Sequence, residues 1–341
     1  MWKLIFLIAA ATLSAQRTLD IYWIDVEGGA ATLIVTPSGQ SLLADTGNPG
    51  DRDAQRIYDV ATKQAHLKKI DSVLITHFHS DHVGGVPALA KLIPASGYID
   101  HGDSVETQNP ADAQRWEAYK SAAAANRKSL AVGDHIALKG VKVEIVSSNG
   151  NVLAKGGQPN SLCSSATKKD PDPTENARSL GFKLTYGKFT FLDLGDLTWN
   201  KELELACPDN RLGQVTLFQA THHGFFNDNS GAPEHVWALA PQVVIVNNGP
   251  RKGLGANAWD TIAKIPGLED TWQVHLSLAT DSAHNVNEQK IANMEATAQC
   301  KGYYLKASIS SDGKFTITNS RNNYSKSYTA IGERPSSHSA H

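Results

Sequence analysis

A short stretch of the chain concentrates side chains that bind metals. Residues 75–85 read ITHFHSDHVGG, which places His77, His79, Asp81 and His82 within six positions. Imidazole nitrogens and carboxylate oxygens together suit zinc above other biological metals, and manganese or iron also accept them. A polar turn after a strand is the plain alternative, but histidine is uncommon and such clustering is rare by chance. The stretch therefore predicts a metal site.

The spacing within this stretch indicates two neighbouring ions. His77 and His79 are expected at the end of an apolar strand, where residues two apart share a face and can bind one ion. Asp81 and His82 follow in the turn before a helix, so they point to a displaced position that suits a second ion. The glycine pair at 84–85 allows the close backbone approach that such a turn needs.

Two later stretches can supply further ligands. An apolar strand predicted over 189–194 ends in Gly195–Asp196, and a carboxylate can bridge two cations. The next apolar run ends in THHG, which contains His222 and His223. All three stretches stand at strand ends, so one edge of the sheets is expected to collect them.

The elements that position these side chains form a mixed pattern. Short apolar runs between Gly, Pro and Ser predict strands, and a period of 3.6 predicts helices. Strands are expected over 21–25, 31–36, 41–45, 72–77, 98–100, 141–147, 180–186, 189–194, 214–219, 242–246, 302–309 and 314–319. Helices are expected over 53–67, 86–92, 111–126, 201–206, 258–265 and 286–297, and an inserted surface loop over 150–173. This alternation predicts an α/β (α+β) sandwich of mixed sheets covered by helices.

Composition narrows the classes of partner. The chain has 341 residues, 41% of them hydrophobic, which is enough for a sizeable core, and its formal net charge is −2. No Lys/Arg-rich run is present, whereas proteins that neutralise many phosphates show a basic face. Small-molecule substrates are therefore favoured over extended nucleic acid. The sequence does not predict an oligomeric state.

The N-terminus reads MWKLIFLIAAATLSAQ, the layout of a secretory signal peptide over residues 1–15. The apolar run is too short for a membrane span, and no lipid-anchor cysteine follows it. A buried N-terminal strand is the alternative. We expect export to the periplasm or medium, without a stable membrane anchor. In an oxidising compartment one disulfide is expected, and the loop-like surroundings of Cys163 and Cys207 favour that pair over one with Cys300.

The motifs in their order resemble a known family. DVEGGAATLIV at 25–35, LLADTG at 42–47, HFHSDH, LGD at 194–196 and HHG at 222–224 resemble the metallo-β-lactamase superfamily. The order is most similar to the ComEC/Rec2-type hydrolase branch, whose members begin with a DVGQGDA-like strand and carry an HHGS-like motif. The resemblance implies an αββα sandwich in one hydrolase domain over 16–332, followed by a flexible tail over 333–341.

The resemblance also implies a dinuclear centre with two zinc ions and assigns its ligands. His77 and His79 would hold the first metal, Asp81 and His82 the second, Asp196 would bridge both, and His222 would complete the second. Asp45 would orient a ligand histidine from behind. His223 would donate a proton to the leaving group or pack under the site.

Three departures from the family pattern bear on the site. The usual third histidine of the first metal is absent before the strand at 180–186, where Glu175, Asn176 or a distant His101 would have to substitute. Gly28 and Ala30 stand where the branch has Gln and Asp, and Phe225 replaces the serine after HHG. The last two changes indicate an altered substrate pocket.

Hydrolysis is the reaction class that these features predict. A metal-activated hydroxide, oriented by Asp81 or Asp196, would attack a phosphodiester in a small molecule or short nucleic acid. Arg251 and Lys252 would suit a phosphate oxygen, or form a solvated turn, and His284 would approach the site or lie in a surface loop. The alternatives are a lactam or lactone hydrolase and a non-catalytic metal-binding module.

Overall fold

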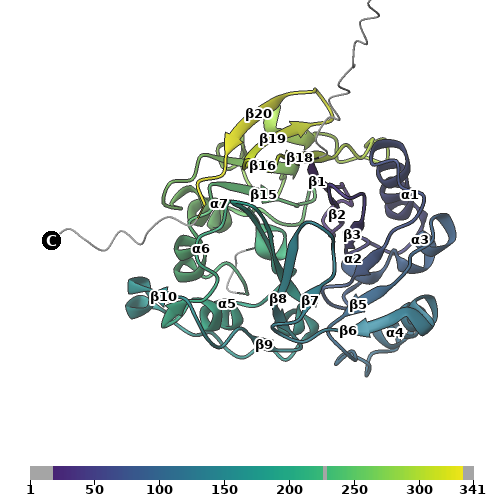
Figure 1. Cartoon of the computed structure of the whole chain (residues 1–341), viewed down its shortest axis with the longest axis horizontal. Coiled ribbons are helices and arrows are strands. Elements are labelled where there is room, and N and C mark those ends of the chain that lie inside the picture. Colours follow the sequence, from purple (N-terminus) through teal and green to yellow (C-terminus); the bar gives the residue numbers. More distant parts are fainter. Residues whose placement is uncertain (1–17, 226–228, 333–341) are drawn as a thin grey trace, which may run out of the picture.

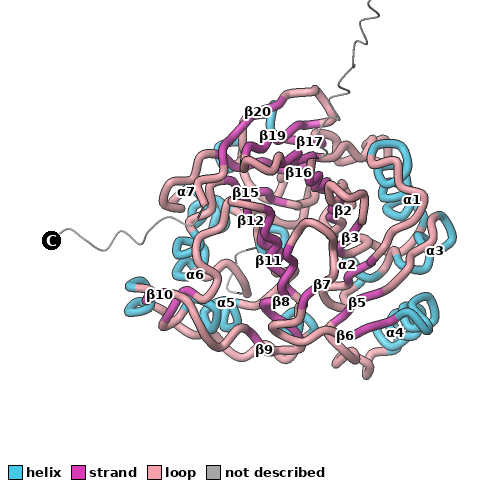
Figure 2. The backbone as a smooth tube through the Cα atoms, in the orientation of Figure 1, coloured by secondary structure: helices cyan, strands magenta, loops and turns pink. Residues whose placement is uncertain are grey.

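Two sheets packed face to face form the centre of the molecule, and helices cover both outer faces (Figure 1). The computed structural model describes residues 18–225 and 229–332, and the structural statements below refer to these. The arrangement confirms the expected αββα sandwich. Figure 2 shows how much of the chain between the strands is loop. The expected signal peptide and tail lie outside the described residues.

The first sheet runs in the order β20-β19-β18-β1-β2-β3-β4-β5-β6. It is antiparallel as far as β3 and parallel from β3 to β6. Its strands are β1 Leu19–Trp23, β2 Thr32–Val35, β3 Ser41–Ala44, β4 Ser72–Leu74, β5 Tyr98–Asp100, β6 Arg127–Ser129, β18 Leu305–Ile309, β19 Lys314–Asn319 and β20 Ser325–Thr329.

The second sheet runs β17-β16-β15-β14-β12-β11-β8-β7, with β9 paired to β8. Its strands are β7 His135–Ile136, β8 Lys142–Ser148, β9 Asn151–Val152, β11 Gly181–Tyr186, β12 Phe189–Asp193, β14 Leu217–Gln219, β15 Val243–Val246, β16 Asp270–His275 and β17 Ile291–Asn293. A separate pair joins β10 Gln158–Pro159 to β13 Asp209–Asn210. The run from β12 to β17 is parallel, and β15 reads VVIV with all four residues buried, as expected for a strand covered on both faces.

Helices α1, α3 and α4 cover the first sheet, and α5, α6 and α7 cover the second (Figure 1). The α-helices are α1 Asp51–Asp59, α2 Ser80–Val83, α3 Val86–Leu92, α4 Pro110–Ala123, α5 Trp199–Ala206, α6 Pro233–Leu239 and α7 Ala256–Ala263. Apolar side chains of both sheets fill the space between them. Within that layer the Gln219 side-chain oxygen accepts from Trp23 Nε1 and Thr32 Oγ1, each at 2.8 Å, and so ties the two sheets together.

Three expectations about elements are wrong. The helix expected over 286–297 is replaced by a short 3₁₀ turn, Glu288–Lys290, and by β17, because Ile291 and Ala292 are buried where β17 extends the second sheet beside β16. The strand expected over 72–77 ends at Leu74, so His77 stands in the loop that follows. Asp81 and His82, expected in a turn, lie in the short helix α2. Helix α6 and strands β6, β7, β9, β10, β13, β16 and β20 were also not predicted.

The cysteine pairing agrees with the expectation. Cys163 and Cys207 form a disulfide, and Cys300 is a free thiol. The bond ties the exposed segment after β10 to the end of α5. Among the described residues no helix has both the length and the apolar character required to cross a membrane.

A buried carboxyl group in α5 predicts an unusual pH dependence of stability. Burial raises the pKa of Glu202 to about 7, although its Oε2 accepts from the Ala232 backbone N–H at 2.9 Å. The unfolded chain releases this proton near pH 4.3, so the native state holds a proton that the unfolded state has lost. This contribution to stability is present at low pH and is lost as pH rises toward 7 and above.

We therefore expect Glu202→Gln to remove a fall of about 3 kcal/mol in the free energy of unfolding between pH 5 and pH 8. Urea unfolding at the two pH values measures it. Glu204→Gln, on the exposed side of the same helix, is the control and should leave the fall in place. Equal pH dependence in both variants would contradict the assignment.

Candidate metal centre

The metal-binding side chains gather where parallel strands of both sheets end. The loops after β3, β4, β12 and β14 carry, in turn, Asp45, the HFHSDH stretch, Asp196 and the HHG stretch. Strands that run parallel end at one edge, and loops at that edge form the usual binding crevice of such sheets. The expected position of the site at strand ends is therefore the position that the structure gives it.

One group of four ligand atoms is fully assembled. Atoms of Asp81, His82, Asp196 and His223 all lie within 4.8 Å of one another. His82 Nε2 is 3.3 Å from Asp81 Oδ2 and 3.3 Å from Asp196 Oδ2. His223 Nε2 is 3.2 Å from His82 Nε2 and 3.4 Å from Asp196 Oδ1. Two imidazoles and two carboxylates thus converge on one point.

A second pair of imidazoles stands beside this group. His77 Nε2 and His79 Nδ1 lie 3.1 Å apart, and His77 Nε2 is 3.9 Å from Asp196 Oδ2. Both residues belong to the loop after β4, so the argument from alternation along a strand does not apply. The loop nevertheless turns the Nε2 atom of one ring and the Nδ1 atom of the other toward each other, as two ligands of one ion require.

The two histidines of the HHG stretch occupy different places in the cluster. His223, expected as a proton donor, is the histidine that joins Asp81 and His82, whereas His222 was expected there. His222 Nε2 lies 3.3 Å from Asp196 Oδ2, and its Nδ1 is 3.3 Å from Ser230 Oγ. Both histidines have left-handed backbone angles, φ 53° for His222 and 57° for His223. Such strain is characteristic of functional sites, and it turns two consecutive rings toward Asp196.

Asp45 lies behind His82, where it was expected to orient a ligand histidine. Its Oδ2 is 2.7 Å from His82 Nδ1 and accepts from Thr76 Oγ1 at 2.8 Å. Its Oδ1 accepts from the Thr76 backbone N–H, also at 2.8 Å. A carboxylate on the outer nitrogen directs Nε2 of the ring inward, toward Asp81 and Asp196.

Glu106 contacts the outer ring nitrogen of His79, as Asp45 contacts that of His82. The sequence did not predict this role for Glu106. Its Oε2 lies 3.0 Å from His79 Nε2, the ring nitrogen that faces away from His77. The residue stands in an irregular loop between β5 and α4, and no motif marks it. Only the folded chain brings it to His79.

We expect Glu106→Gln to weaken metal binding by roughly 10–100-fold, because the amide cannot replace the carboxylate that orients His79. Titration with a chromophoric metal chelator measures this. Asp103→Asn, an exposed carboxylate in the same loop whose ion pair is with Arg127, is the matched control. Unchanged affinity in Glu106→Gln would show that Glu106 does not support the site.

Two of the three residues proposed to replace the missing third histidine, Glu175 and His101, are paired with each other. Glu175 Oε2 is 2.9 Å from His101 Nε2 and accepts from the Phe78 backbone N–H at 3.2 Å. Its Oε1 accepts from Ser104 Oγ and from the Val105 backbone N–H. Glu175 and His101 thus form a buried pair that fastens the β5–α4 loop to the HFHSDH stretch. The expectation that either is a ligand is not supported.

Asn176 is the remaining candidate for the missing ligand. Its side chain is largely buried, and its Oδ1 has no hydrogen-bond partner among the described residues. Among the described residues no hydrogen bond joins its side chain to a candidate ligand. Asn176 therefore stays an open prediction.

Of the residues expected to bind substrate, Lys252 alone reaches the cluster. Its Nζ contacts Asp81 Oδ2. A side chain on Gly28, which has φ +101°, would come within 3.0 Å of Lys252 Cβ, so glycine leaves room for this lysine. Arg251 is exposed, and His284 is paired with Asp281 at 2.6 Å. The expected roles of Arg251 and His284 receive no support from their positions.

Electrostatics show that a divalent cation fits the cluster. Burial lowers the pKa of His77 well below its usual value and that of His222 to about 4, so both rings are neutral and can act as ligands. Burial also acts on His82, but the carboxylates of Asp196, Asp45 and Asp81 outweigh it and raise its pKa well above the usual value. The carboxylates thus attract a proton and the Lys252 ammonium to the place where a cation would bind.

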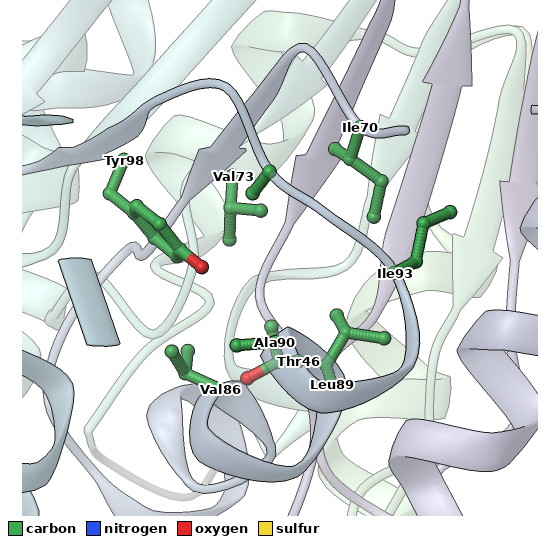
Figure 3. Close-up of a pocket in the computed structure, with 9 residues that line it drawn as sticks. Thr46, Ile70, Val73, Val86, Leu89, Ala90, Ile93 and Tyr98 are labelled. Atoms are coloured by element: carbon green, nitrogen blue, oxygen red, sulfur yellow. The ribbon is translucent and has the colours of Figure 1, made fainter. Parts of the chain in front are cut away.

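A small cavity near the site is unsuited to substrate (Figure 3). It lies under α3 and is lined mainly by apolar side chains, among them Val73, Leu89 and Tyr98. Thr46 borders it, but its hydroxyl and its backbone N–H both donate to the His82 carbonyl. The cavity is part of the packing behind the metal centre.

Comparison with known proteins agrees with this geometry. Residues 24–155 match the model of the metallo-beta-lactamase superfamily. The match covers less than half of the chain, and the likeness to that superfamily holds for this segment. A UPF0173 metal-dependent hydrolase of Cupriavidus taiwanensis is 38% identical over 91 residues, which are 26% of this chain and 29% of that protein. An atrochrysone carboxyl ACP thioesterase of Cryptosporiopsis sp. is 29% identical over 130 residues, 38% of this chain and 40% of that protein.

Solved structures with related folds are more distant. The metallo-beta-lactamase fold protein YhfI of Bacillus subtilis has a TM-score of 0.46 and 11% identity, over 74% of this chain and 95% of that one. CmlA of Streptomyces venezuelae, a diiron β-hydroxylase, has a TM-score of 0.40 and 14% identity, over 75% and 48% of the two chains. At these values the structures say nothing about the activity of this chain.

Proposed function

We propose that the protein is a zinc-dependent hydrolase whose reaction centre is built on Asp81, His82, Asp196 and His223. The convergence of their ligand atoms within 4.8 Å is the observation that carries the proposal. His77 and His79 would hold a second ion beside them, and manganese or iron could replace zinc. When bound, such metals make water a strong nucleophile near neutral pH and polarise the bond to be broken.

Three side chains of the cluster, those of Asp196, Asp81 and Lys252, would have different roles in the reaction. Asp196 contacts histidines through both of its oxygens, so it is placed to bridge two ions. Asp81 lies at the open side of the cluster, where its carboxylate would orient the attacking water by accepting its proton. Lys252, whose Nζ contacts Asp81 Oδ2, would stabilise negative charge on the substrate.

A phosphodiester in a small molecule or short nucleic acid is the substrate class that we favour. The support is Lys252, a cation that reaches the cluster and suits a phosphate oxygen. An acyl substrate such as a thioester, lactone or lactam is the second candidate. It is favoured by the name of the thioesterase relative and by Phe225, which is 37% exposed beside the His222 ring and offers an apolar wall.

We also propose that the protein is exported and that it belongs to the ComEC/Rec2-type hydrolases. The disulfide between Cys163 and Cys207 supports an oxidising compartment, in keeping with the signal peptide expected over 1–15. The ComEC/Rec2-type assignment and the single hydrolase domain over 16–332 rest on the sequence motifs. The chain covers under a third of the length of the UPF0173 hydrolase reported above. The activity of such a relative therefore does not identify the substrate of this chain.

Parallel rate measurements test the substrate class. The purified, zinc-loaded protein is assayed on a chromogenic phosphodiester, a thioester, a lactone and a β-lactam. We expect diester turnover, with kcat/KM falling about 10²–10³-fold in Lys252→Ala because a charge-stabilising donor is lost. Arg251→Ala, in the same turn but exposed, is the control and should act like the wild type. Turnover of the acyl substrates alone would replace the favoured class with the second candidate.

A further inference from the structure

A second cluster of ligand atoms lies apart from the metal centre. Atoms of Asp25, His275 and Cys300 all stand within 4.8 Å of one another. Asp25 follows β1, His275 ends β16, and Cys300 belongs to the loop before β18. Asp25 and His275 are fully buried, Cys300 is partly buried, and its Sγ is 3.4 Å from Asp25 Oδ2.

The imidazole of His275 points to a missing partner. Its Nδ1 faces the Leu276 carbonyl oxygen at 3.1 Å, whereas its Nε2 is buried without a hydrogen-bond partner among the described residues. Asn248 fixes its backbone, because Asn248 Nδ2 donates to the His275 carbonyl at 2.7 Å. A buried nitrogen left unpaired costs stability, so such a group usually has a ligand.

We propose that Asp25, His275 and Cys300 bind a single zinc ion, separate from the reaction centre. One thiolate, one imidazole and one carboxylate are a ligand set that zinc favours, with solvent in the fourth position. On binding, the Cys300 thiol releases its proton to solvent and the sulfur takes the ion in its place. A hollow lined by Cys300, Asn293 and Tyr303 gives the ion access.

The charges around the cluster are compatible with a dication. Zinc is balanced by the carboxylate and the thiolate. The nearby Arg56 guanidinium lies 3.2 Å from Asp25 Oδ2 and 3.1 Å from Glu27 Oε1. Glu27 also pairs with Arg52, so Glu27 and Asp53 together balance the two guanidinium groups. Asn248 donates to the His275 carbonyl and stands at the start of the turn that leads to Lys252. An ion bound to His275 would therefore stabilise the position of that turn.

Cobalt substitution gives a test that is specific for this cluster. The chain has three cysteines and two form the disulfide, so Cys300 is its one free thiol. The reaction centre contains no sulfur. Cobalt(II) loading should therefore produce a near-ultraviolet thiolate-to-cobalt band in the wild type and in Asp196→Asn, and no such band in Cys300→Ser. The zinc content of Cys300→Ser should fall by one ion per chain.

Thiol reactivity supplies an independent readout on the wild-type protein. Zinc should slow the reaction of Cys300 with a thiol reagent by at least about tenfold, and a chelator should restore it, because a bound thiolate is shielded. This measurement still decides the matter if Cys300→Ser does not fold. No thiolate band in cobalt-loaded wild type, or zinc-independent reactivity, would overturn the site. Neither result would contradict the proposed hydrolase activity, which is tested separately by the turnover of substrates.

Discussion

Replacement of Asp196 by asparagine is expected to lower the hydrolysis rate by roughly 10³-fold or more and to release metal. Asp196 is buried at the centre of the cluster and has contacts with His82, His222 and His223. An amide cannot supply the charge or the second anionic oxygen that a bridge between two cations needs. Loss of several kcal/mol of transition-state stabilisation corresponds to this factor.

The measurement combines metal content by mass spectrometry with initial rates on whichever substrate the wild type turns over. Asp193→Asn is the matched control, because Asp193 is also buried and stands three residues earlier, where it accepts from the Gly195 backbone N–H at 3.0 Å. Burial raises the pKa of Asp193 to about 7, so a neutral amide is a mild change there. Full metal content and activity in Asp196→Asn would disprove the proposed centre.

Substitution of the two adjacent histidines should give unequal effects. His223→Gln is expected to weaken metal binding by more than about 100-fold, beyond the 10–100-fold typical of an outer partner. The reason is that His223 Nε2 stands in the group with Asp81 and His82, so its loss removes a ligand. His222→Gln should weaken binding less, because His222 touches the group only through Asp196.

Metal titration of both variants, with circular dichroism to verify folding, decides between the two histidines. Each residue has a left-handed backbone, so each variant starts from the same local strain and serves as the control for the other. A larger loss in His222→Gln would restore the assignment made from the family motif. Equal losses would mean that both rings bind metal, and would make His222 a candidate for the missing third ligand of the first ion.

The sequence alone predicts the class of the fold, which the structure confirms, and most of the side chains that gather at the candidate metal centre. Its apolar runs predict the strands of a covered sandwich, and the order HFHSDH, LGD and HHG predicts ligands at strand ends. These features are readable because each lies within a few adjacent residues. The disulfide Cys163–Cys207 was also favoured from the sequence, because both cysteines lie in loop-like stretches.

Tertiary structure decided what depends on distant segments meeting. Glu106 reaches His79 across 27 positions, and Glu175 pairs with His101 across 74 instead of serving as a ligand. His223 rather than His222 stands with Asp81 and His82, and this depends on where the loop after β14 meets α2, which no motif encodes. Asp25, His275 and Cys300 are separated by up to 275 positions, and only the stacking of two sheets brings them together. Short sequence motifs predict which types of residue form the site, whereas the packing of distant segments decides which of their atoms face one another.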